Sequence, residues 1–144
     1  LPTTAQIVGI RSDVTDYLDD GATLAGVAAA VLPDVKRHLR NSRGIKWSQV
    51  YSTTGDAYFQ DTDSEDNNED QLTTVIANAV ISRVFRNYSI RMTNEADQWF
   101  DLAEYYQVQW QELLESAVLD VDTDESGSIE EDEERQTGQT FLGR

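Results

Sequence analysis

Residues 71–88 read QLTTVIANAVISRVFRNY, and this stretch decides which class of fold the chain adopts. Apolar side chains recur along it every three or four residues, which is the spacing of one face of an α-helix. These positions are Leu72, Val75, Ile76, Ala79, Val80, Val84, Phe85 and Tyr88. They trace one broad face, so we expect a long helix that buries this face in a core.

Residues 94–119 predict a second long helix with the same periodicity. Its inward positions are Trp99, Leu102, Ala103, Tyr106, Trp110, Leu113, Leu114 and Ala117. The side chains expected to face away are Asp97, Asp101, Glu104, Gln107, Gln111 and Glu115. The short connection SIRMTN favours two antiparallel neighbours that form the core of a bundle. At helical spacing, Trp99, Tyr106 and Trp110 are expected in the core or a subunit interface rather than in a ligand box.

Shorter elements are predicted on the N-terminal side. Residues 3–20 indicate one or two short helices. Pro33 fits the first turn of another helix, because proline is tolerated at a helix start. This helix should stop between Asn41 and Gly44. Residues 45–59 are rich in aromatic and β-branched side chains and favour extended structure, such as a hairpin. The acidic stretch 60–70 is typical of a surface loop.

The fold class expected from these patterns is mainly α. We predict a small helical bundle with two long antiparallel helices, a long loop or hairpin insertion, and an extended C-terminal tail. The expected division is an N-terminal helical segment (residues 1–30), a helical-bundle core (31–119), and an acidic calcium-type loop with a tail (120–144).

The charge of the chain is strongly negative. Its 144 residues carry a net charge of -16, with 16 Asp, 11 Glu, nine Arg and only two Lys. Such a surface stays hydrated in concentrated salt, so the composition favours a halophilic source. The charge also disfavours binding to DNA, RNA or anionic membranes. No apolar run is long enough to cross a bilayer and no export signal is visible, so a soluble protein is expected.

The stretch DTDESGSIEEDE, residues 122–133, matches the calcium-binding loop of an EF-hand. Gly127 occupies the sixth position, where a sharp turn is needed. The predicted metal ligands are Asp122, Asp124, Ser126 (through its side chain), Ser128 (through its carbonyl), Glu130 and Glu133. No second helix is indicated after the loop, which favours a structural calcium ion over a sensor switch. Alternatively, Gly127 ends a helix and the acids belong to a solvated tail.

Residues suited to catalysis are scarce. His38 is the one histidine, the chain has no cysteine, and no phosphate-binding glycine loop or nucleophile elbow occurs. Clustered carboxylates have no diagnostic value in a chain with 27 acids. We therefore expect a protein that is not an enzyme, with His38 on the basic face of its helix.

The segment LPDVKRHLRN (residues 32–41), followed after an acidic loop by DQLTTVIANAV (70–80), resembles the head-to-tail connector, or adaptor, family of long-tailed viruses. The resemblance implies a helical bundle that assembles into a ring, dodecameric in that family, under the portal of the capsid. The implied partners are other copies, the portal protein and an adjacent neck or tail protein, with DNA passing through the ring without specific binding. The implied location is the neck of the virion, after assembly in the host cytoplasm.

The resemblance also gives the C-terminal tail a role, because in that family the tail docks into neighbouring subunits. Phe141 and Leu142 are apolar in a polar tail and would be its anchors, with calcium fixing the direction in which the tail leaves. The segment between the two matching helices is longer than in the family, and about 30 residues precede the match. Two other classes remain open: a stand-alone EF-hand-like calcium-binding interaction protein, and a DNA mimic that inhibits a DNA-binding enzyme.

The calcium loop gives a testable prediction. Glu133→Gln should weaken calcium binding at least tenfold, about 1.4 kcal/mol, because the last loop position supplies two carboxylate oxygens. Calorimetric titration of chelator-treated protein measures the affinity. Glu134→Gln removes the same charge one residue outside the loop and should leave the affinity unchanged. Equal affinities for the two variants would contradict the assigned loop register.

Overall fold

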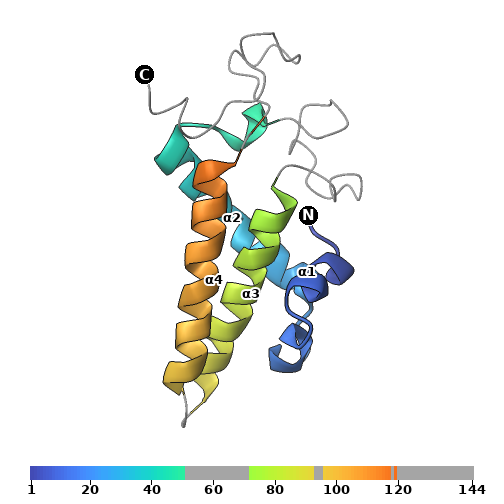
Figure 1. Ribbon diagram of the computed structural model, residues 1–144. Coiled ribbons are helices and arrows are strands. Elements are labelled where there is room, and N and C mark those ends of the chain that lie inside the picture. Colours follow the sequence, from blue (N-terminus) through green and yellow to red (C-terminus); the bar gives the residue numbers. More distant parts are fainter. Residues whose placement is uncertain (51–71, 93–95, 118, 120–144) are drawn as a thin grey trace.

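The computed structural model describes residues 1–50, 72–92, 96–117 and 119 (Figure 1). Its helices are α1 (Thr4–Ile10), η1 (Val14–Tyr17), α2 (Leu24–Arg43), η2 (Trp47–Gln49), α3 (Thr73–Arg91) and α4 (Ala96–Ser116). The prediction of a small, mainly helical bundle is confirmed, as are the short N-terminal helices. The predicted acidic loop, the calcium-type loop and the tail lie outside the described residues.

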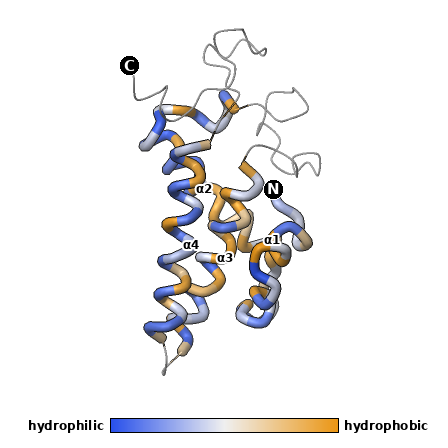
Figure 2. The backbone as a smooth tube through the Cα atoms, in the orientation of Figure 1, coloured by the Kyte–Doolittle hydropathy of each residue, from blue (hydrophilic) through white to orange (hydrophobic). Residues whose placement is uncertain are grey.

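Helix α3 is the centre of the bundle and contacts α1, η1, α2 and α4. Its residues from Val75 to Ser82 are all buried, followed by Val84 and Phe85. The apolar surface of α3 is therefore broader than one face, and the polar side chains Asn78 and Ser82 are buried with it. Figure 2 shows apolar residues along the part of α3 where the other helices meet it.

Helix α4 runs antiparallel to α3, as the short connection predicted (Figure 1). The two helices form the most extensive contact in the bundle. Ala103 is fully buried at this contact, and the hydroxyl of Ser82 donates a hydrogen bond to its carbonyl oxygen over 2.8 Å. Small side chains let the two backbones approach closely, and the hydrogen bond satisfies the buried hydroxyl.

The three aromatic residues of α4 that were expected inside the bundle do lie in or against its core. Tyr106 and Trp110 are buried, and Trp99 is partly buried against the same cluster. The Phe85 ring stacks on Trp99, with 5.8 Å between centroids, and on Tyr106 at 6.2 Å. Tyr17 of η1 also belongs to this cluster, with 5.2 Å between its ring centroid and that of Phe85. This cluster connects the N-terminal segment to the helical pair.

The prediction that Pro33 lies in the first turn of a helix was wrong. α2 is a single helix in which Pro33 is internal. Proline in a helix interior costs about 3 kcal/mol by removing one hydrogen bond and crowding the preceding turn. Here the proline ring is exposed, while Ala28 and Val35 on the opposite face are fully buried. The burial of this face on both sides of Pro33 outweighs the local cost. The helix ends at Arg43, within the predicted range, and Gly44 caps it in a left-handed conformation with φ 68°.

Three further expectations were wrong in the described residues. Residues 47–49 form a short 3-10 helix instead of the extended structure predicted from 45 onward; residues 51–59 lie outside the described residues. On α4, Leu113 is exposed, although its spacing predicted an inward position. Glu104 and Gln107 were expected to face away but turn toward α3, where both contact Arg86.

No helix in the described segments combines the length and the low polarity that crossing a bilayer requires.

The position of Phe85 gives a prediction on stability. Phe85→Ala should lower the free energy of unfolding by about 3–5 kcal/mol, because it leaves a cavity among several aromatic rings. Urea unfolding at one fixed molar salt concentration, followed by tryptophan fluorescence, measures the change. Ile90→Ala removes a side chain that is 77% exposed and should change stability by less than about 0.5 kcal/mol. Similar losses for both variants would argue against the central position of α3.

Candidate functional site

A polar cleft of about 540 Å³ lies between α2, α3 and α4. Its charged lining consists of one aspartate, three arginines and His38: Asp34, Arg37, His38, Arg83 and Arg86. Asn41, Asn87, Gln107 and Gln111 add amide groups to the walls. The chain as a whole has 27 acidic and 11 basic residues, so this excess of arginine reverses the general balance of charge.

Where α2 and α3 line the cleft, the two helices are joined by the ion pair between Asp34 and Arg83. Asp34 accepts a hydrogen bond from Arg83 over 2.6 Å, and its other oxygen lies 3.4 Å from Arg37. Arg83 is one-third exposed, while Arg37 is 68% exposed. One carboxylate thus positions two guanidinium groups at the mouth of the cleft.

Arg86 connects α3 to α4 at the next turn. Its guanidinium donates to Glu104 over 2.9 Å and also to Gln107. The same group lies 5.5 Å from the centre of the Phe100 ring, a cation–π contact on the outer side of α4. The ion pair between Arg86 and Glu104 is partly exposed and therefore adds little to stability. Its main effect is on the relative position of α3 and α4.

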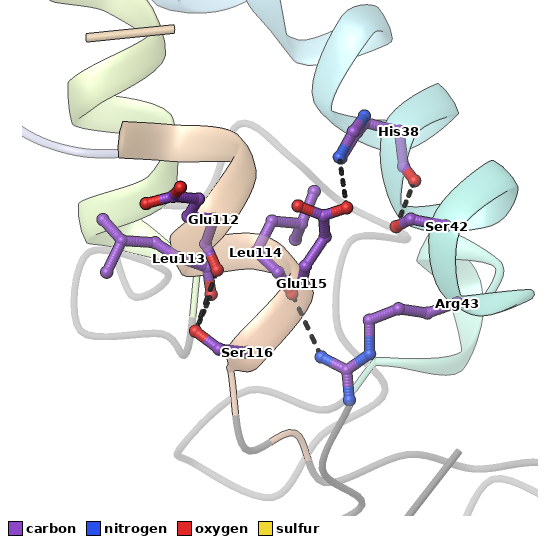
Figure 3. Close-up of polar contacts among 8 residues, drawn as sticks. All are labelled: His38, Ser42, Arg43, Glu112, Leu113, Leu114, Glu115 and Ser116. Carbon is purple, nitrogen blue, oxygen red and sulfur yellow. Dashed lines mark hydrogen bonds and ion pairs between the residues drawn. The ribbon is translucent and has the colours of Figure 1, made fainter. Parts of the chain in front are cut away.

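His38 faces α4 instead of lying with Arg37 and Arg40 on the exposed basic face, which corrects the predicted placement. Its ring meets Trp110 edge to face, with 5.3 Å between centroids. Its Nε2 atom lies 3.8 Å from an oxygen of Glu115, a contact that is ionic only when the imidazole is protonated (Figure 3). His38 therefore closes one end of the cleft.

Arg43, one turn after Leu39 on the same helix, is the most unusual side chain in the core. It is 2% exposed, and its Nη1 donates to the carbonyl oxygen of Leu114 over 3.1 Å (Figure 3) and to that of Ala117 over 2.7 Å. These carbonyls belong to the C-terminal end of α4, where helix carbonyls lack helical partners and the macrodipole attracts a cation. Burial lowers the pKa of Arg43, but a guanidinium stays charged throughout the usual pH range.

The predicted metal ligands are Asp122, Asp124, Ser126, Ser128, Glu130 and Glu133, and all six lie outside the described residues. Residues 1–50, 72–92, 96–117 and 119 contain no cluster of three or more His, Asp or Glu side chains arranged to hold a metal ion. Because the loop is not among these residues, calcium binding there stays a prediction. Phe141 and Leu142, the predicted anchors, are likewise outside.

Sequence reasoning missed the cleft and the role of Arg43. Arg83 and Arg86 stand three residues apart on a helix whose one other charged side chain is Arg91, and this spacing was a usable signal for a charged groove. Nothing local marked Asp34 as the partner of Arg83, because 49 residues separate them. Arg43 lay within a basic segment and looked like an ordinary surface residue.

The arrangement suits recognition of anionic groups. Guanidinium groups bind carboxylates or phosphates through two parallel hydrogen bonds, and amide side chains extend such contacts. Comparison with known proteins gives no further assignment: no protein-family model, no curated protein and no solved structure matches this chain.

The buried arginine gives a prediction. Arg43→Ala should destabilise the fold by about 2–4 kcal/mol, because it removes charge-assisted hydrogen bonds to α4 and leaves a cavity. Arg40→Ala removes an exposed arginine on the same helix and should change stability by less than about 0.5 kcal/mol. Urea titration monitored by circular dichroism compares the two variants. A small effect of Arg43→Ala would show that the end of α4 does not depend on this contact.

Proposed function

We propose that this chain is a structural subunit of the neck of a tailed virus, forming a ring that joins the capsid portal to the tail. The observation that carries the proposal is the packing of the two segments that resemble the connector family. Residues 32–41 lie in α2 and residues 73–80 in α3, and these helices are packed neighbours joined by the Asp34–Arg83 ion pair. The long aromatic helix expected after them is α4.

The charge of the chain is consistent with a conduit for DNA. A lumen lined with carboxylates repels phosphates, so a genome slides through without stalling on bound cations. The residues that would face this lumen belong to a chain with more than twice as many acidic as basic side chains. In this proposal the host is a salt-loving organism, since the same carboxylates keep the surface hydrated in concentrated salt.

The proposed partners are other copies of the chain, the portal protein and an adjacent neck or tail protein. The proposed location is the virion neck, after assembly in the host cytoplasm. The loop at residues 122–133 would hold a structural calcium ion that directs the tail, and Phe141 and Leu142 would anchor the tail in a neighbour. The alternative function is a stand-alone EF-hand-like calcium-binding interaction protein.

Light scattering in molar salt tests the assignment. We expect a particle much larger than the 16.2 kDa monomer, formed by the chain alone or on addition of purified portal protein. Calcium should tighten the assembly and a chelator should loosen it, because the loop precedes the docking tail. A monomer that ignores the portal protein but becomes more stable with calcium would replace the neck assignment with the calcium-binding alternative.

A further inference from the structure

The exposed face of α4 carries a continuous acidic row. Positions four, three, four, four and three residues apart lie on one side of a helix. On α4 these positions are Asp97, Asp101, Glu104, Val108, Glu112 and Glu115, all exposed except Glu104, which is partly buried and paired with Arg86. The helix contains no lysine or arginine along its 21 residues. Like charges at this spacing repel one another, so the row favours contact with a cationic surface.

Apolar side chains lie within and beside this acidic row. Val108 stands in the middle of it and is 47% exposed. Phe100 and Tyr105 flank it and are 44% and 55% exposed. Three large apolar side chains surrounded by carboxylates have the composition of a protein contact, with an apolar centre and a polar rim.

The exposed face of α2 has the opposite charge. Arg37 and Arg40 are exposed and lie three residues apart on the same side of the helix, one and two turns after the exposed Pro33. Asp34 is the one acidic residue in α2, and it is already engaged by Arg37 and Arg83. Arg40 carries a charge that no described carboxylate neutralises at ion-pair distance. This face continues into the arginine-lined cleft described above.

We propose that the acidic row of α4 in one copy docks against the α2 face and the cleft mouth of the next copy. Charge complementarity identifies a second copy as the occupant, because each chain carries both members of the match on different helices. A contact between two different surfaces is heterologous, and repeated heterologous contacts close into a ring when the rotation permits. The inference rests on the proposed ring and assigns the faces that build it.

The dimensions of the two faces agree with such a contact. The acidic row extends from Asp97 to Glu115, a rise of about 27 Å at 1.5 Å per residue. The exposed residues of α2 from Ala30 to Arg40 extend over about 15 Å, so they fit within the row. Ala30 and Pro33 are short, and they would let Val108 approach the backbone while the arginines reach carboxylates on either side.

Charge reversal tests the contact. One variant carries Arg37→Glu and Arg40→Glu, and the other carries Asp101→Arg and Glu112→Arg; the latter two side chains are exposed and make no described ion pair. Each variant alone should need at least about tenfold more protein to assemble than the original chain, because like charges then face each other. Light scattering at a single molar salt concentration measures assembly, and circular dichroism verifies folding.

Mixing the two variants restores opposite charges at every contact and should restore assembly. A chain with all four substitutions should likewise assemble with itself. Asp16→Arg with Asp20→Arg makes the same charge change as the α4 variant, on exposed residues of the N-terminal segment, and should leave assembly unchanged.

The outcomes separate this inference from the proposed function. If the original chain assembles and both variants assemble equally well, the docking faces are wrong while the ring stands. If each variant alone fails to assemble and neither the mixture nor the fourfold variant assembles, the proposed pairing of these two faces is also wrong. A chain that never assembles, with or without portal protein, overturns the ring and this contact together.

Discussion

The burial of α3 on nearly all sides is the constraint on which the rest of the structure depends. An isolated helix of this length is marginal in water, and its apolar surface is broader than a single partner can cover. α4 covers one side, α2 a second, and α1 with η1 a third. Each of these elements buries its own apolar face against α3, so their positions follow from one central helix.

The polar contacts of the bundle refine this arrangement without creating it. Ser82 bonds a carbonyl of α4 where the two backbones are close, and Arg43 bonds two carbonyls at the end of the same helix. Ser82 and Arg43 are buried donors, and each bonds a specific carbonyl oxygen. Such contacts select one register between two helices, whereas apolar packing alone tolerates several. The Asp34–Arg83 and Arg86–Glu104 pairs act similarly at the edge of the core.

The distribution of charge is uneven in a way that the net charge conceals. α4 is acidic along its exposed face, whereas the C-terminal half of α2 and the cleft beside it are rich in arginine. In a very acidic chain most carboxylates need only water as a partner. A separated cationic face is unusual in such a chain, and the proposed contact between copies is based on it.

The sequence by itself determined the helical class, the two long antiparallel helices and the end of α2 at Gly44, because apolar periodicity and glycine at a helix end are local signals. The calcium-type loop is likewise a prediction from the sequence alone, because its proposed ligands are contiguous in the chain. Tertiary structure alone decided that Pro33 stays inside a helix, since the buried faces on both sides of it supply the compensating energy. It also decided that His38 and Arg43 turn toward α4 and that Arg83 meets Asp34. These contacts join residues about 50 to 75 positions apart, and no local pattern encodes which distant side chain will lie opposite.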